Sequence, residues 1–448
     1  MSDVVSPLKR KEIIAALRIG TVPRRGLELF AVGLERFEKA IDDELHAVAT
    51  GGGQFKAVRG EYGTGKTFFS RWLEHRARLE GFATSLVQIS ETETPLYKMQ
   101  TVYRRCIEAL ETQEWSTGAF ASLIDRWLYS LEEEVIAGGE SPDDADAFGK
   151  GVGNLLEKRL AEITKTQPQF AAVLRACYEA RLREDHATEQ GLIAWLMGQP
   201  NVAASVKQMA GIKGDLDSDG AAGFLRGLLE ILRQTGRKGL VLVLDEVETI
   251  QRVRGDSREK SLNALRALSE DVHRGRYPGL YVLITGTPPF FDGPHGVKRA
   301  PALAQRLQAD FSGDPQFHNP RASQIALQPF SMSRMLEVGQ RIRDLYPTAV
   351  PERVRARVND AMIERLARAV SGQLGNQVGI APRLFLRRLI DVLDRVEEFE
   401  AFDPAQHYQI ILNASELTPE EAAAAGVSRS VDDIELDLGG GDREGGDA

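Results

Sequence analysis

The sequence predicts an α/β fold in which a parallel sheet is covered by helices on both faces. Continuous aliphatic runs, separated by helical patterns, give the expected strands at 55–58, 85–89, 239–244, 280–284 and 325–327. Such runs are typical of parallel strands, which are buried on both faces. A glycine-rich loop joins the first strand to a helix, and the patterns after Pro329 are helical again. A helical domain is therefore expected after the sheet.

The glycine-rich loop is the most specific motif in the chain. Its eight residues are Gly60, Glu61, Tyr62, Gly63, Thr64, Gly65, Lys66 and Thr67. They match the full phosphate-loop (Walker A) pattern, in which glycines let backbone N–H groups converge on phosphates and the following helix points its positive end at them. Lys66 would neutralise phosphate charge and Thr67 would ligate Mg²⁺. The motif therefore predicts ATP and Mg²⁺ as cofactors, and not a chance glycine turn.

A second motif supplies two acids. The aliphatic run 240–244 ends in Asp245 and Glu246, which predicts a Walker B segment. Both carboxylates should lie at the carboxyl edge of a central strand, where ligands of open sheets bind. Asp245 would hold Mg²⁺, directly or through water, and Glu246 would orient and polarise the attacking water. Hydrolysis is therefore expected, and Glu248 is interpreted as an acid at a helix start rather than as a catalytic group.

Thr285 is the candidate for a sensor of nucleotide state. It follows the strand at 280–284 and precedes Gly286. Its hydroxyl could reach the γ-phosphate or the attacking water from a neighbouring strand. A threonine before a Gly-Pro turn is common, so this prediction depends on its position at the expected sheet edge.

The order of phosphate loop, Walker B, sensor strand and helical lid resembles the AAA+ ATPases, especially their initiator-like and STAND-like branches. By this resemblance, Arg383 after Pro382 is a second sensor that reaches the γ-phosphate from a lid helix and acts in catalysis. A Pro-Arg pair at a helix start is otherwise ordinary. The resemblance also implies a trans-acting arginine in an oligomer, for which Arg299 and Arg306 are both candidates.

The N-terminal segment carries a further resemblance. Residues 16–26 resemble the segment with which such ATPases wrap the adenine, so Val22 and Pro23 could contact the base. A linker punctuated by glycine and proline, without ligand contact, is the alternative. Residues 16–27 and 58–69, the latter including Phe68 beside the phosphate loop, closely resemble the BREX phage-resistance ATP-binding proteins, in particular the shorter BrxD type.

The resemblance to the BREX proteins spans roughly residues 10–400. It implies an ATPase that acts on or near DNA, with other BREX-type defence proteins as partners, an ATP-dependent homo-oligomer, and double-stranded DNA as a candidate ligand. Basic residues at 9–11, 24–25 and 383–388 are candidate DNA contacts, or serve only phosphate sensing and solubility. An ATP-gated scaffold that hydrolyses slowly or never is the alternative function. A GTPase is disfavoured because the chain has no Asn-Lys-x-Asp signature.

The predicted organisation has five parts. They are an adenine-wrapping segment with the first part of the ATPase core at 1–100, a helical insertion at 101–215, the second part of the core at 216–330, a helical lid at 331–412, and an acidic disordered tail at 413–448. The insertion is inferred because Lys66 and Asp245 are much further apart in sequence than the about 50 to 60 residues of one helix and one crossover. One amphipathic helix is expected over 27–45.

Composition adds a few limits. The net charge is −9, but residues 431–448 hold seven acids and one arginine, so the charge does not exclude DNA binding. No apolar run approaches the roughly 20 residues of a membrane helix, and the start lacks a secretion signal. No membrane association and a cytoplasmic location are expected. Cys106 and Cys177 are isolated in the sequence and are expected to be buried thiols, without a disulfide or zinc.

Overall fold

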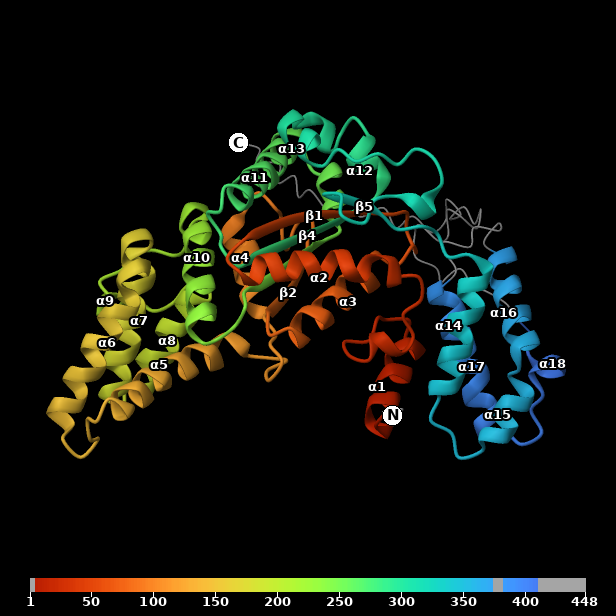
Figure 1. The fold of residues 1–448 in the computed structure, drawn as a ribbon, viewed down its shortest axis with the longest axis horizontal. Coiled ribbons are helices and arrows are strands. Elements are labelled where there is room, and N and C mark those ends of the chain that lie inside the picture. Colours follow the sequence, from red (N-terminus) through yellow and green to blue (C-terminus); the bar gives the residue numbers. More distant parts are fainter. Residues whose placement is uncertain (1–4, 374–381, 410–448) are drawn as a thin grey trace, which may run out of the picture. The chain divides into compact units, whose positions relative to one another are not determined.

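The computed structural model describes residues 5–373 and 382–409, which divide into two compact units (Figure 1). The first unit contains the N-terminal residues to 16 and residues 22–329. The second contains residues 17–21 and the chain from 330 onward. The tail predicted at 413–448 lies outside the described residues.

The first unit is built on a five-stranded parallel sheet with the strand order β2-β3-β4-β1-β5. The strands are β1 (Gly53–Arg59), β2 (Ala83–Gln88), β3 (Leu240–Asp245), β4 (Leu280–Gly286) and β5 (Gln324–Ala326). This sheet confirms the predicted α/β class, and each strand lies within two residues of its predicted bounds. The register pairs Gln88 with Asp245 and Val58 with Thr285, so the carboxyl ends of four strands meet at one edge.

Helices cover both faces of the sheet, as predicted. Helices α2 (Glu35–Ala49) and α3 (Lys66–Leu79) pack on one face, in front of the strands in Figure 1. Helices α4 (Met99–Glu108), α10 (Ser218–Gln234) and α11 (Gly255–His273) share a hydrophobic core with the other face. Because side chains alternate along a strand, Leu240, Leu242 and Leu244 enter that core while Val241 and Val243 face α2 and α3.

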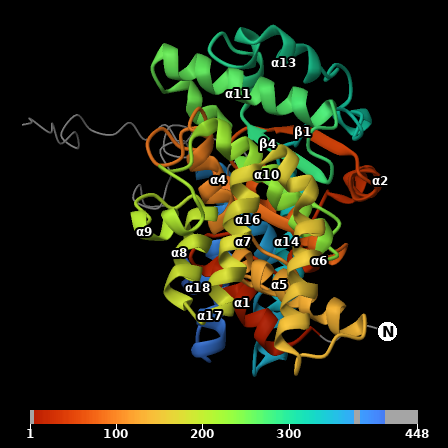
Figure 2. The same cartoon turned by 90° about the vertical axis from the view of Figure 1, so that its left-hand side faces the viewer.

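Five helices lie between α4 and α10, in the range predicted as a helical insertion (Figure 2). They are α5 (Ala119–Ala137), α6 (Ala145–Thr166), α7 (Pro168–Leu182), α8 (His186–Leu196) and α9 (Ala204–Met209). The fully buried ring of Phe224 on α10 contacts Tyr103 of α4, Phe170 of α7 and Trp195 of α8 at centroid distances of 6.0, 5.0 and 5.3 Å. The core of these helices is therefore continuous with that of the sheet.

The predicted single helix over 27–45 is wrong in its first part. Residues Leu27–Leu29 form a short 3₁₀ helix, η1, and α2 begins only at Glu35. Gly26 and Gly33 both have φ of +78°, a left-handed conformation that interrupts a right-handed helix. The apolar spacing continues through this break because both pieces bury their apolar side chains against the same unit.

Short elements complete the first unit. They are α1 (Pro7–Arg18), whose last two residues belong to the second unit, η2 (Val247–Gln251), α12 (Pro288–Asp292), η3 (Val297–Arg299), α13 (Pro301–Arg306) and η4 (Pro315–Phe317). Of these, η2 follows β3 and α12 follows β4, so both begin at the sheet edge where these strands end.

The second unit is helical. It contains α14 (Met332–Leu345), α15 (Pro351–Arg357), α16 (Asp360–Gln373), α17 (Pro382–Glu398) and α18 (Pro404–His407). Helices α14 and α16 touch so closely that a Cβ at Gly339 would lie 2.6 Å from Ile363 Cγ2. The N-terminal segment 17–21 joins this unit because Arg18 donates two hydrogen bonds of 2.7 Å to the Asp394 carboxylate on α17.

Candidate nucleotide-binding site

The predicted phosphate loop connects β1 to the start of α3. Gly63 and Gly65 have φ of +77° and +91°, so glycine is required at both positions. A Cβ at Gly60 would lie 2.3 Å from Thr64 Oγ1, which itself donates to the Glu61 carbonyl at 2.8 Å. The first turn of α3 contains no acid, and the first N–H groups of a helix have no acceptor within it. The loop and this helix end therefore form a site suited to an anion.

Lys66 is buried, with 8% of its surface exposed, at the first position of α3. Its ammonium donates to the carbonyl oxygens of Gly60 at 2.9 Å and Glu61 at 3.3 Å, and lies 5.0 Å from the centroid of the Tyr62 ring. Burial lowers the pKa of Lys66, while nearby carboxylates oppose the change. The Lys66 ammonium is thus held by carbonyl groups of its own loop. The oxygens of a bound phosphate could replace these carbonyl groups as its hydrogen-bond partners.

Asp245 brings three elements together at the carboxyl edge of the sheet. Its Oδ2 accepts a hydrogen bond of 3.1 Å from the Thr67 hydroxyl on α3, and its Oδ1 accepts one from the Thr285 hydroxyl on β4. A carboxylate and a hydroxyl are the hard oxygen ligands that Mg²⁺ uses beside phosphates and water. Residues 5–373 and 382–409 contain no cluster of three or more His, Cys, Asp or Glu side chains suited to a metal. The oxygens of Thr67 and Asp245 would suit an ion that phosphates and water also ligate.

Glu246 has an unusual backbone at this edge. Its φ of +59° and ψ of +41° lie in the left-handed region, which costs about 1 kcal/mol for a residue with a side chain. Its N–H donates to Thr285 Oγ1 at 3.1 Å, and its carboxylate accepts from Gln88 Nε2 at 3.0 Å. Thr285 therefore binds both acids of the Walker B segment, and its predicted contact with the γ-phosphate stays a prediction.

The family comparison agrees with this geometry. The model of the BREX system ATP-binding protein BrxC/D family matches residues 5–411. The chain belongs to this family. The match makes it an ATP-binding protein of the BREX defence system, with other BREX proteins as its context. No curated protein matches the chain.

Sequence reasoning missed the position of Glu248 in this BrxC/D-family protein. Glu248 lies in the first turn of η2, as an acid at a helix start, but it is 5% exposed and neither carboxyl oxygen has a hydrogen-bond partner among the residues that the structure describes. Its Oε1 is 4.0 Å from the Lys66 ammonium. Burial raises its pKa to about 7, although Lys66 opposes the change. The only signal in the sequence was a third acid close behind Asp245.

Gln88 was also missed, although the signal was available. It is the last residue of β2, and the parallel register places it opposite Asp245. A polar side chain at the end of a strand that neighbours the Walker B strand reaches the same edge of the sheet. Its bond to Glu246 therefore orients the acid that was predicted to act on water.

The predicted adenine contacts lie near the start of the 22–329 part of the first unit. Val22 is half-buried and Pro23 is buried. The segment that follows them reaches α3, because the rings of Phe30 and Phe68 meet edge to face at 5.4 Å. Phe68 is thus engaged with Phe30, and contacts of Val22, Pro23 and Phe68 with the base stay predictions.

The three arginine candidates differ in their surroundings. Arg306 donates to the Ala302 carbonyl at 3.0 Å and to Glu270 at 3.4 Å. Arg299 is exposed at the end of η3, and no ion pair joins it to any described residue. Arg383 is the second residue of α17 in the second unit, where a Cβ at Gly20 would lie 3.3 Å from its Nη1. Its role at the γ-phosphate stays a prediction.

The described part of the family member contains no helix that is long and apolar enough to span a bilayer. Cys106 and Cys177 are both free and buried, which confirms the predicted burial of the two thiols.

Proposed function

We propose that the protein is an ATP-hydrolysing AAA+-type switch or motor of the BrxD type, acting on or near DNA with other BREX proteins. One observation carries this proposal: the Asp245 carboxylate bonds both the Thr67 hydroxyl, next to Lys66, and the Thr285 hydroxyl. Residues that are far apart in sequence thereby form one site with a phosphate-binding loop, oxygen ligands for Mg²⁺ and an adjacent acid.

Each side chain has a defined task in this mechanism. The loop N–H groups and Lys66 bind and orient the β- and γ-phosphates. Thr67 and Asp245 would hold Mg²⁺, which supplies charge neutralisation on the phosphate oxygens. Glu246 accepts a proton from the attacking water, and Gln88 together with Thr285 fixes the direction of its carboxylate and backbone. Arg383 and a trans-acting arginine would report the nucleotide state to the lid and to a neighbouring subunit.

The test is steady-state ATP turnover of the purified chain, with and without double-stranded DNA at two salt concentrations, because phosphate contacts weaken as salt rises. Glu246→Gln should abolish turnover and keep ATP binding. Glu93→Gln is a matched control, because the Glu93 side chain is 78% exposed on the surface. Stimulation by DNA supports the motor.

An ATP-gated scaffold is the second candidate function, and the strained backbone and hydrogen bonds of Glu246 argue against it, since binding alone needs no oriented acid. Wild-type turnover equal to that of Glu246→Gln, with ATP bound by both, would establish the scaffold instead. The native mass with and without ATP tests the proposed homo-oligomer.

A further inference from the structure

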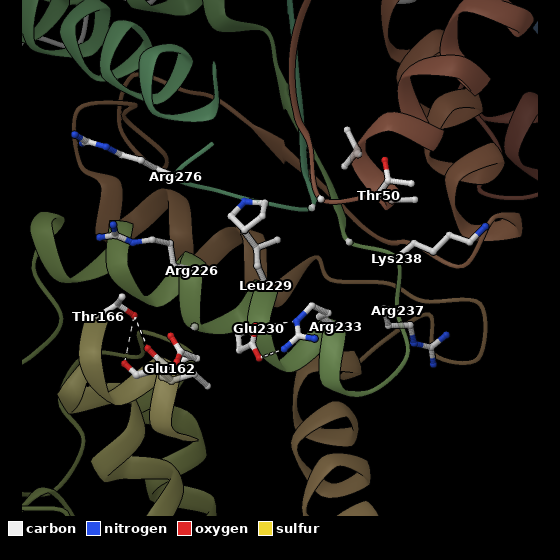
Figure 3. A pocket seen from close by; sticks show the side chains of 18 residues that line it. Thr50, Glu162, Thr166, Arg226, Leu229, Glu230, Arg233, Arg237, Lys238 and Arg276 are labelled. Carbon is white, nitrogen blue, oxygen red and sulfur yellow. Dashed lines mark hydrogen bonds and ion pairs between the residues drawn. The ribbon is translucent and has the colours of Figure 1, made fainter. Parts of the chain in front are cut away.

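A cavity lies at the amino edge of the sheet, opposite the edge that holds the phosphate loop. Its volume is about 510 Å³. Gly51, Gly239 and Gly279, which line it, stand directly before or near the starts of β1, β3 and β4, and α6 and α10 supply its other wall (Figure 3). Because all five strands are parallel, the ATP site at their carboxyl ends is at the other edge. The two sites therefore share strands but no residues.

The cavity is rich in basic side chains. Arg226, Arg233, Arg237, Lys238 and Arg276 line it, against the acids Glu162 and Glu230. Three of the bases pair with acids that are not part of the lining: Arg237 with Glu114 at 2.5 Å, Lys238 with Glu80 at 3.0 Å and Arg276 with Asp271 at 2.9 Å. Glu162 in turn bonds Lys165, also outside the lining, at 2.7 Å. The lining thus carries five bases against two acids, and the acids outside it offset three of the bases.

Arg226 is the least satisfied of these groups. Its Nε is buried and has no hydrogen-bond acceptor, and no ion pair joins its guanidinium to another described residue. The guanidinium carbon lies 5.8 Å from the centroid of the Tyr277 ring. Figure 3 places Arg226 and Arg276 at one end of the cavity. A buried N–H without an acceptor is costly, so an anion that reached Arg226 would supply an acceptor that the described residues do not.

The remaining lining favours a small ligand over a nucleic-acid strand. Val48, Ile163, Leu229 and Pro278 contribute apolar walls. A concave volume of a few hundred Å³ with apolar walls and a few polar groups is typical of small-molecule sites. A nucleic acid instead needs an extended basic stripe along an element. Arginine forks match phosphate oxygens with two parallel hydrogen bonds, so phosphate is the anion that this set fits best.

We propose that this cavity binds a small phosphorylated molecule, with Arg226 and Arg276 as the phosphate contacts. The site is separate from the ATP site and does not rest on the proposed hydrolysis. Its ligand is held by two arginines that neither the phosphate loop nor the Walker B segment uses.

The test is a calorimetric titration with pyrophosphate on the full chain carrying Lys66→Ala, so that the phosphate loop contributes little. One site per chain is expected, with an affinity that falls as salt rises. Adding Arg226→Gln should weaken binding at least tenfold, and so should Arg276→Gln, which covers the case that the first variant folds poorly. Arg183→Gln is the control, since Arg183, directly after α7, is 56% exposed and pairs with Glu179 of that helix.

Three results would overturn the proposal. They are no binding at millimolar pyrophosphate, binding that both arginine variants leave unchanged, and tighter binding of a ten-nucleotide oligothymidine than of pyrophosphate, which would assign the cavity to nucleic acid. ATP turnover of Arg226→Gln with Lys66 intact is measured in parallel and should equal that of the wild type. A chain without turnover that still binds pyrophosphate would refute the proposed function and keep this site.

Discussion

The Thr285 hydroxyl donates to Asp245 Oδ1 across two neighbouring strands, so a residue predicted to sense phosphate also positions the predicted Mg²⁺ ligand. The Thr285 hydroxyl oxygen also accepts a hydrogen bond of 3.1 Å from the Glu246 N–H. Thr285 is fully buried, and its single hydroxyl proton is used by Asp245. One side chain therefore fixes both acids of the Walker B segment.

Thr285→Val should separate positioning from binding. Valine keeps the shape but removes the hydroxyl, which leaves an oxygen of Asp245 and the N–H of Glu246 without this partner. We expect turnover to fall at least tenfold and stability to fall by about 1–3 kcal/mol, while affinity for Mg-ATP changes by only a few fold. Thr285→Ser keeps the hydroxyl and should retain most activity. Turnover of Thr285→Val at the wild-type rate would contradict this role.

Glu248 should make the stability of the nucleotide-free protein depend on pH. Its pKa is about 7 in the folded chain, against an ordinary value of 4.5. Between these values the folded state holds more protons than the unfolded state, so stability decreases as pH rises through this window, by at most about 3 kcal/mol. The Glu248→Gln variant has no carboxyl group at this position, so its stability does not decrease in this way as pH rises. Its melting temperature should therefore rise relative to wild type between pH 5 and pH 8.

The melting temperatures of both proteins are compared at pH 5, 6, 7 and 8 in the absence of nucleotide. Glu93→Gln serves as the control, because the Glu93 side chain is 78% exposed. A constant difference for Glu248→Gln would show that Glu248 does not titrate in this range.

The two cysteines should be inert in the native protein. Cys106 is 1% exposed and Cys177 is 0% exposed. Burial raises the pKa of Cys106 to about 12 and also raises that of Cys177, so neither forms the reactive thiolate near neutral pH. An aromatic disulfide reagent at pH 8 should titrate no thiol in native protein and two per chain in denaturant. If one thiol reacts quickly in the native protein, the segment that contains this cysteine must open to solvent.

The sheet and the motif residues could be predicted because their signals are local. A strand buried on both faces must be aliphatic throughout, and the phosphate loop is contiguous from Gly60 to Thr67. The meeting of Thr67 with Asp245 followed from the rule that ligands bind at the carboxyl edge of such a sheet. The residues at that edge that belong to no motif could not be predicted from the sequence in the same way.

Gln88, Glu248 and Arg226 depend on tertiary structure. Gln88 reaches Glu246 through the β2–β3 register, and Glu248 is buried because η2 turns back toward Lys66. Arg226 is one of several arginines on helices, and its place beside the strand starts, with a buried Nε that has no acceptor among the described residues, depends on how α10 packs. The error in the predicted helix over 27–45 has a local cause instead. Gly33 interrupts the helix, although the apolar spacing on both sides of it is helical.

Arg299, rather than Arg306, should act in trans if the protein works as an oligomer. Arg306 is engaged within its own subunit by Glu270 and the Ala302 carbonyl, whereas Arg299 is exposed without an ion pair to any described residue. Arg299→Ala should lower turnover at least 1000-fold, the lower end of the range of about 10³–10⁵ for a complete arginine finger, and keep ATP binding. Arg306→Ala should instead lower the melting temperature and keep most turnover.

Mixing two inactive proteins tests the trans arrangement directly. Arg299→Ala retains an intact phosphate loop, and Lys66→Ala retains an intact Arg299. In a mixed oligomer, some interfaces combine the intact loop of one subunit with the intact arginine of its neighbour, so part of the turnover should return. Mixing Arg299→Ala with Glu246→Gln should restore activity in the same way. If neither mixture is more active than its components, while native mass shows that the oligomers form and exchange, Arg299 does not complete a neighbour's site.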